Sequence, residues 1–162
     1  MLEVGGGVGA VELELLRRGA ARATNIELSH GYEREAAALA AEAGVEGHIA
    51  RRHGDFVAAG AEVDPADVVV MHRVVCCYPD PEALVGGAAE HARRLLAMSF
   101  PRDTWWIRLG SRTANVFFRA VGWIESYIHP PAAILAAAEA RGLSRMHEHS
   151  GRIWQVAVLE RV

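Results

Sequence analysis

Three acidic side chains lie within or directly after three short strand-like stretches: Glu3, Glu27 and Asp55. A carboxylate can accept hydrogen bonds from both hydroxyls of a ribose or from the exocyclic amine of adenine, and it can pair with an ammonium group. If the three stretches are neighbouring parallel strands, the carboxylates line one crevice along the carboxyl edge of the sheet. The spacing therefore predicts a site for a nucleoside that also carries an amino acid.

A glycine-rich loop follows the first of these acids. Gly5, Gly7 and Gly9 alternate along it, and such glycines let the chain turn sharply from a strand into a helix and let a ligand approach the backbone. The loop also fits the dinucleotide fingerprint loosely, as Gly5-x-Gly7-x-x-Ala10. Taken alone, it leaves open a nicotinamide cofactor or a tight turn without a ligand.

Reactive side chains follow the apolar, mostly β-branched run 68–71, which is typical of a central strand buried on both faces. His72 is a candidate general base and Arg73 a candidate anion-binding group. Tyr78 is a third candidate for contact with a substrate. The alternatives are a polar strand end for His72 and, for Cys77 and Tyr78, packing against the next helix.

Strands and helices alternate from the first residue, which favours a parallel sheet with helices on both faces. The expected strands are 1–4, 23–28, 48–52, 68–71, 95–100, 144–149 and 153–159. The expected helices are 11–18, 31–43, 79–93, 104–123 and 132–141. The last two strands are joined by Ser150-Gly151 as a hairpin, so one of them runs antiparallel. We therefore predict an α/β, Rossmann-like three-layer sandwich with a mostly parallel seven-stranded sheet, in a single domain 1–162.

Composition narrows the class of partner. The formal net charge is −3, which gives no basic field for a nucleic acid. The only cysteines, Cys76 and Cys77, are adjacent and cannot form a useful structural staple. No apolar run approaches the ~20 residues that span a bilayer, and no leader precedes the first strand. We expect a cytoplasmic protein with a small-molecule substrate and neither nucleic-acid nor membrane partners.

Histidines and aromatic residues in the second half offer weaker candidates. His147 and His149 share one face of a strand, but solvated histidines are commoner than metal ligands, and we predict no metal site. Tyr127 and His129 are candidate acceptor contacts. Four aromatic residues at helical spacing either belong to the core, the commoner case, or line an acceptor pocket: Trp105, Trp106, Phe117 and Phe118.

The sequence resembles class I S-adenosylmethionine (SAM) dependent methyltransferases over essentially its whole length. Residues 2–9 look like their first motif, 25–29 like the acidic motif of the second strand, and 54–56 like the third motif. The resemblance implies that the glycines wrap the methionine part, Glu27 holds the ribose and Asp55 the adenine. The implied cofactor contacts are Glu3, Gly5, Gly7, Gly9, Glu27, Leu28, Asp55, Phe56 and His72. The candidate catalytic residues are His72, Arg73 and Tyr78.

A weaker similarity is to the magnesium-protoporphyrin O-methyltransferase branch, on residues 73–79, 95–101 and 127–129. That branch carries a histidine at the position of Cys77, so the resemblance does not assign a porphyrin. The methyltransferase resemblance implies methyl transfer to a small molecule, with oxygen the preferred acceptor. The alternatives are an NAD(P)-dependent oxidoreductase and a non-catalytic SAM-binding domain. We also expect that an N-terminal cap is missing, and that an exposed first strand and an uncovered crevice favour a homo-oligomer.

Overall fold

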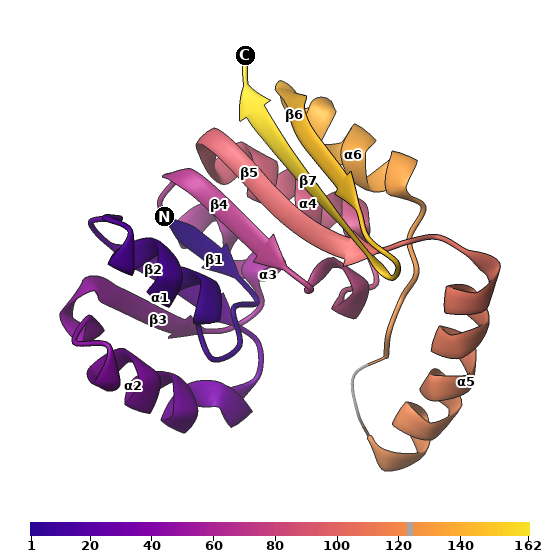
Figure 1. The fold of residues 1–162 in the computed structure, drawn as a ribbon, viewed down its shortest axis with the longest axis horizontal. Coiled ribbons are helices and arrows are strands. Elements are labelled where there is room, and N and C mark those ends of the chain that lie inside the picture. Colours follow the sequence, from indigo (N-terminus) through magenta and orange to yellow (C-terminus); the bar gives the residue numbers. More distant parts are fainter. Residues whose placement is uncertain (123–124) are drawn as a thin grey trace.

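A computed structural model describes residues 1–122 and 125–162. Its centre is a seven-stranded sheet in the order β3-β2-β1-β4-β5-β7-β6 (Figure 1). The strands are β1 (Leu2–Val4), β2 (Ala23–Glu27), β3 (Ile49–His53), β4 (Ala66–His72), β5 (Ala92–Pro101), β6 (Leu143–Ser150) and β7 (Trp154–Arg161). The predicted fold class is confirmed.

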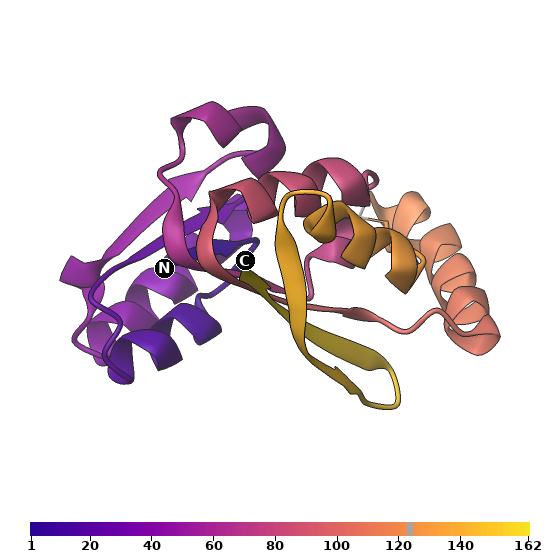
Figure 2. The same ribbon diagram turned by 90° about the horizontal axis from the view of Figure 1, so that it is seen from above.

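Helices cover both faces of the sheet. The α-helices are α1 (Ala10–Arg17), α2 (Glu33–Glu42), α3 (Phe56–Ala59), α4 (Pro81–His91), α5 (Trp105–Val121) and α6 (Pro131–Glu139). Short 3-10 turns complete the chain: η1 (His30–Tyr32), η2 (Glu46–His48), η3 (Gly60–Glu62) and η4 (Val75–Cys77). Helices α1 and α2 lie on one face, and α3, α4 and α6 on the other (Figures 1 and 2).

Strand direction places the candidate site. The pairs β1–β2, β1–β4, β2–β3 and β4–β5 are all parallel, so these five strands end at the same edge of the sheet. Strand β7 runs antiparallel to both β5 and β6, between which it lies. The C-terminal hairpin is therefore confirmed, and the loops after β1, β2, β3 and β4 meet along one edge.

The core fills the space between the sheet and the α4 and α6 layer. Val69 and Met71 of β4 are fully buried, as the apolar run 68–71 predicts. Alternate residues of β5 face the same layer, which brings Leu96, Met98 and Phe100 into the core. The parallel pairing of β1 with β4 places the carboxyl ends of the two strands side by side over this core.

Several expected boundaries are shifted by pairing in the sheet. Helix α4 ends at His91 and β5 begins at the next residue, because Ala92 pairs with Ala66 and extends the ladder towards the helix. The helix expected at 31–43 opens instead with η1, capped by Ser29, whose Oγ accepts a hydrogen bond from the Gly31 amide at 3.2 Å. The expected end of the helix 104–123 falls on Trp123, outside the described residues.

The first strand is not exposed. β1 lies at the centre of the sheet, with β2 on one side and β4 on the other, and Leu2 and Val4 are buried. The strand edge that was expected to favour self-association is therefore already paired, and that argument for a homo-oligomer is wrong. The edge strands are β3 and β6.

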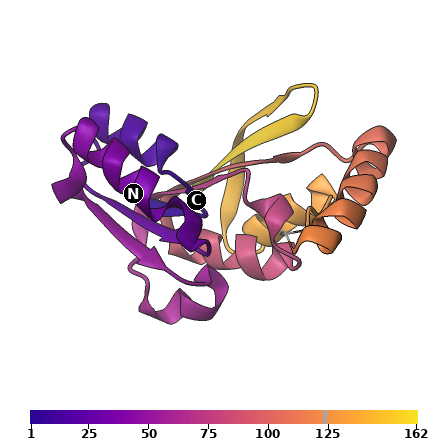
Figure 3. The same ribbon diagram turned by 90° about the horizontal axis from the view of Figure 1, so that it is seen from below.

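Helix α5 stands away from the sheet (Figures 1 and 3). The interpretation of its aromatic residues as core is wrong, because Trp105 is 76% exposed and Phe117 59%. The helical spacing correctly predicted an amphipathic helix. Spacing does not say what packs against the apolar face, and only Ile107 of this helix is buried within the described residues.

Candidate cofactor and acceptor site

The glycine loop joins β1 to α1 through three left-handed residues. Gly5, Gly7 and Gly9 have φ of 65°, 56° and 83°. A Cβ on Gly5 would stand 2.3 Å from Val74 Cγ2, so that glycine serves close packing. A Cβ on Gly7 would meet nothing within 4 Å. The middle glycine therefore presents its backbone to open space, where a ligand can approach it.

Glu27 fastens this loop to the end of β2. Its Oε2 accepts a hydrogen bond from the Gly7 amide at 2.8 Å, and its Oε1 accepts one from the Ser29 amide at 2.8 Å. The side chain is only 7% exposed. Each carboxylate oxygen has a second lone-pair direction, so Glu27 retains acceptor capacity for the two hydroxyls of a ribose.

Arg51, in β3, holds the loop from beneath and was missed by the sequence reasoning. Its Nη2 donates to the Gly7 carbonyl at 2.9 Å and to Glu33 Oε1 at 3.3 Å, and its Nη1 donates to Glu12 Oε1 at 3.3 Å. The side chain is 14% exposed. The only sequence signal was an arginine inside a predicted strand, which does not reveal its partners in the glycine loop and in helices α1 and α2.

Glu3 lies under the loop. It is 1% exposed, and its Oε2 accepts a hydrogen bond from the Glu12 amide at 2.9 Å. Burial, with the neighbouring Glu12 carboxyl as the next cause, raises the pKa of Glu3 to about 8. Glu3 is therefore mostly protonated at neutral pH in this structure.

Asp55 and Tyr78 form a linked pair in the segments that follow β3 and β4. Asp55 caps α3 by accepting from the Val57 amide at 2.9 Å, and the Tyr78 hydroxyl donates to Asp55 Oδ2 at 3.1 Å. Burial and this hydrogen bond raise the pKa of Tyr78. Tyr78, a candidate catalytic residue from the sequence, thus orients the acid expected to bind adenine. Neither strand spacing nor motif indicated that link.

The two apolar residues next to the acids differ in position. Leu28 is 52% exposed, at the sheet edge where a cofactor contact was expected. Phe56 is 4% exposed, and its ring packs edge-on against His91 at a centroid distance of 5.3 Å. Because the Phe56 ring is packed into the interior, only its main chain remains to contact a ligand at that edge.

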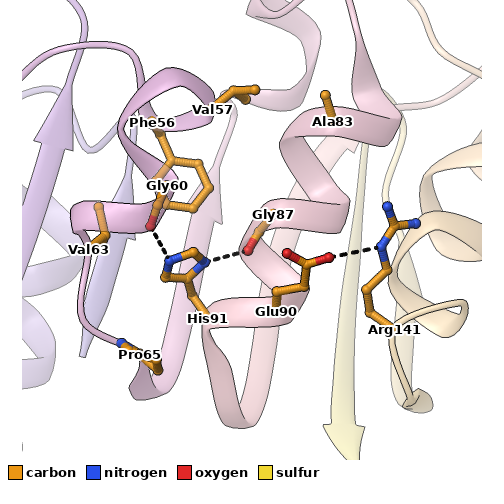
Figure 4. Close-up of a pocket in the computed structure, with 10 residues that line it drawn as sticks. All are labelled: Phe56, Val57, Gly60, Val63, Pro65, Ala83, Gly87, Glu90, His91 and Arg141. Atoms are coloured by element: carbon orange, nitrogen blue, oxygen red, sulfur yellow. Dashed lines mark hydrogen bonds and ion pairs between the residues drawn. The ribbon is translucent and has the colours of Figure 1, made fainter.

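A cavity of about 630 Å³ lies between α3 and α4. His91 crosses it, with Nδ1 2.7 Å from the Gly87 carbonyl and Nε2 2.9 Å from the Gly60 carbonyl (Figure 4). Phe56 alone among the candidate site residues lines this cavity. The cavity is therefore separate from the edge at which the acids and glycines meet.

The end of β4 carries the candidate catalytic residues. His72 Nδ1 lies 3.0 Å from Ser99 Oγ, and burial together with the Arg73 charge lowers the pKa of His72, which keeps it neutral at pH 7. Arg73 has a left-handed φ of 58°. Such a conformation costs a non-glycine residue roughly 1–2 kcal/mol and is concentrated at functional sites. The Arg73 guanidinium lies 4.8 Å from the centroid of the Trp154 ring.

The segment before α6 is fastened to the same region. The Tyr127 amide donates to the Cys76 carbonyl at 2.7 Å, and His129 Nε2 lies 2.9 Å from the Tyr78 carbonyl. The rings of Tyr127 and His129 stack with centroids 5.8 Å apart. The two candidate acceptor contacts are thus near the β4 end, and His129 positions the turn that carries Tyr78.

Replacement of Gly7 by alanine should weaken ligand binding far more than stability. The φ of 56° is unfavourable for alanine by about 1 kcal/mol, but the new Cβ meets no atom of the protein. In Gly5→Ala, the matched control, the Cβ meets Val74, and stability should fall further, by about 2–3 kcal/mol. Urea denaturation measures the loss of stability in each variant. Equal losses in Gly7→Ala and Gly5→Ala would contradict the assignment of Gly5 to packing and of Gly7 to ligand binding.

The family of the chain follows from comparison with known proteins. Residues 1–97 match the methyltransferase domain family, and the chain belongs to that family. It is a class I SAM-dependent methyltransferase by family and fold, with SAM as the cofactor of the class. The methyltransferase interpretation of the chain is confirmed over the NAD(P) alternative.

Solved structures share the fold at low sequence identity. Magnesium protoporphyrin IX methyltransferase from Synechocystis PCC 6803 has a TM-score of 0.79 and 22% identity, over 99% of this chain and 73% of that chain. For an O-methyltransferase family protein from Burkholderia thailandensis, the TM-score is 0.78 and the sequence identity 18%, over 99% of this chain and 50% of that chain. For geranyl diphosphate C-methyltransferase from Streptomyces coelicolor A3(2), the TM-score is 0.76 and the sequence identity 14%, over 99% of this chain and 71% of that chain. No curated protein matches the sequence.

Two kinds of feature bear on other partners, namely membrane-spanning helices and metal-binding clusters. Within residues 1–122 and 125–162, no helix is both long and apolar enough to cross a membrane. In the same residues, no group of three or more histidine, cysteine, aspartate or glutamate side chains is arranged to hold a metal ion. His147 and His149 lie on the edge strand β6, where both are exposed.

Proposed function

We propose that this chain binds SAM along the carboxyl ends of β1 to β4 and transfers its methyl group to a small molecule. The observation that carries the proposal is the glycine loop held by Glu27, with Gly7 facing open space. In this assignment the loop wraps the methionine part, Glu27 accepts from the ribose hydroxyls, and Asp55 accepts from the adenine amine. The Glu3 carboxyl lies under the loop as the acid for the cofactor ammonium.

The residues present fit this cofactor chemically. SAM, when bound, supplies an electrophilic methyl group on a sulfonium sulfur. The chain supplies acceptor oxygens for the hydroxyl and amine groups, at Glu27 and Asp55, and an unobstructed backbone at Gly7. Leu28 adds an exposed apolar surface beside Glu27. We further propose that residues 1–162 act as one domain.

Acceptor chemistry is assigned to the end of β4. His72 has a lowered pKa and is therefore neutral at pH 7, so its imidazole can take a proton from an acceptor hydroxyl. Arg73, which lies over Trp154, offers a guanidinium to an anionic group of the acceptor. Positioning supplies much of the catalysis of an in-line displacement. An oxygen acceptor on an anionic small molecule suits these two groups best.

The first test is a calorimetric titration of the chain with S-adenosylhomocysteine, the product form of the cofactor, with NAD as the control. We expect saturable 1:1 binding of S-adenosylhomocysteine, with a Kd on the order of 1–100 µM, and no heat from NAD. Binding of NAD alone would overturn the cofactor assignment. Binding of neither would remove the support for the site at the glycine loop.

The second test separates catalysis from binding alone. The chain is incubated with SAM and a panel of small carboxylates, phenols and amines, and formation of S-adenosylhomocysteine is followed. We expect turnover with an anionic oxygen acceptor, and a rise in its KM of about tenfold in Arg73→Gln from loss of a charged contact. Turnover of amines alone would contradict the oxygen preference. Cofactor binding without any turnover across the panel would favour a non-catalytic SAM-binding domain.

A further inference from the structure

The adjacent cysteines Cys76 and Cys77 bring their thiols together in the turn η4. Their sulfur atoms are 3.9 Å apart, and both thiols point at the Arg73 carbonyl, at 3.5 and 3.7 Å. Cys76 is buried and Cys77 is exposed. One thiol is therefore open to a reagent from solution, and the other stands directly behind it.

The environment of the exposed thiol makes it a nucleophile. A hydrogen bond from Cys76 lowers the pKa of Cys77 to about 7, although burial and the Glu27 carboxylate oppose this change. The same hydrogen bond and burial raise the pKa of Cys76, on which the Arg73 charge has a smaller, lowering effect. The lowered pKa enlarges the thiolate fraction of Cys77 near neutral pH, and the thiolate is the form that attacks peroxides.

The turn that holds these thiols is also connected to the proposed cofactor site. The Cys76 carbonyl accepts from the Tyr127 amide, and the Cys77 amide donates to the Val74 carbonyl at 2.8 Å. The next residue, Tyr78, donates its hydroxyl to Asp55. A change in the peptide between the two cysteines must therefore move the residue that orients Asp55.

We propose that Cys76 and Cys77 are a peroxide-reactive pair that forms a reversible disulfide and thereby weakens cofactor binding. Formation of the disulfide is inferred from the geometry of the two thiols. The effect on the cofactor rests on the proposed function, because it acts through Asp55.

The chemistry requires a hydroperoxide as the oxidant. The Cys77 thiolate attacks one peroxide oxygen, the O–O bond breaks, and Cys77 becomes a sulfenic acid while the departing oxygen takes a proton. The Cys76 sulfur, after losing its proton, displaces hydroxide from the Cys77 sulfur. For hydrogen peroxide the sum is one disulfide and two waters from two thiols and one peroxide, a balanced two-electron oxidation.

The product must be easily reduced. Adjacent residues have Cα atoms about 3.8 Å apart across a trans peptide, whereas disulfides usually join Cα atoms about 4.4–6.8 Å apart. A bond between neighbours is therefore strained, and strained, exposed disulfides are the labile ones. This strain makes the pair unsuitable as a structural staple and suitable as a switch.

The test treats the reduced chain with hydrogen peroxide and measures free thiols, intact mass and affinity for S-adenosylhomocysteine. Because these are the only two cysteines in the sequence, the thiol assay reports on this pair alone. We expect loss of both thiols, a mass decrease of two hydrogens, and an affinity about tenfold lower, as for one weakened hydrogen bond. Dithiothreitol should restore all three values.

Two single variants isolate the steps. Cys76→Ser should give a sulfenic acid on Cys77 that dimedone traps, and Cys77→Ser should resist peroxide. Retention of both thiols in the wild type, or a disulfide-linked dimer on a non-reducing gel, would overturn the disulfide. An internal disulfide with unchanged affinity would overturn the coupling to the cofactor. Absence of binding by the reduced chain would instead count against the proposed function, while the thiol assay still judges the disulfide.

Discussion

Replacement of Glu27 by alanine should lower the affinity for S-adenosylhomocysteine by about 100-fold or more. The carboxylate makes two hydrogen bonds that shape the site, to the amides of Gly7 and Ser29. The variant loses both, together with the proposed contacts to the ribose hydroxyls. Hydrogen bonds to a charged group contribute about 1.5–3 kcal/mol each, so two of them account for a change of this size. Calorimetric titration measures it directly.

The controls separate loss of the ligand contact from loss of the fold. Glu27→Gln keeps the shape and one carbonyl acceptor, and we expect its affinity to fall by only about tenfold. Glu42 ends α2 and is exposed, so Glu42→Ala removes an equal charge away from the site and should change nothing. Unchanged affinity in Glu27→Ala, with wild-type thermal stability, would refute the assignment of the ribose site.

The fold could be predicted because its signals are local. The apolar run of β4 and the turn at Ser150-Gly151 each identify an element from adjacent residues, and the parallel order then follows from general rules of connection. The positions of Glu27 and Asp55 could be predicted for the same reason. A residue at or just beyond the end of a parallel strand lies at the carboxyl edge of the sheet, whichever strand is its neighbour.

Contacts that join distant segments could not be found in this way. Arg51 reaches the Gly7 carbonyl from 44 positions along the chain, and Tyr78 reaches Asp55 from 23. Both side chains have several polar neighbours available in principle, and only the three-dimensional packing selects one. The exposed face of α5 shows the complementary limit: periodicity gives the apolar face of Trp105 and Phe117 but not its surroundings.

Replacement of Glu3 by glutamine should stabilise the chain at alkaline pH. An ordinary glutamate titrates near 4.5, whereas the pKa of Glu3 in the fold is about 8. Between these values the folded chain holds a proton that the unfolded chain has released, so stability falls as the pH rises through this window. The full penalty is present above pH 8 and corresponds to roughly 4–5 kcal/mol. Glutamine cannot ionise and avoids it.

Urea denaturation at pH 5, 7 and 9 measures this effect. The wild type should lose stability between pH 5 and 9, and Glu3→Gln should lose much less. A smaller slope should remain, because burial also raises the pKa of Glu12. Glu14 is on the same helix as Glu12 and forms an exposed ion pair with Arg18, which contributes little to stability. Glu14→Gln is therefore the matched control and should follow the wild type to within about 0.5 kcal/mol. Parallel curves for wild type and Glu3→Gln would refute the raised pKa.

A buried acid with such a penalty needs a compensating role, and the proposed ammonium contact provides one. If Glu3 serves the amino-acid end of the cofactor, the bound ammonium group favours the ionised carboxyl of Glu3. Glu3→Gln should then bind S-adenosylhomocysteine about tenfold more weakly, as for loss of one charged contact. It should bind 5′-methylthioadenosine, which lacks the amino acid, as well as the wild type does. Equal weakening for both ligands would show that glutamine distorts the loop. A gain in stability together with a lower affinity for S-adenosylhomocysteine alone would establish that Glu3 destabilises the fold and contributes to recognition of the cofactor.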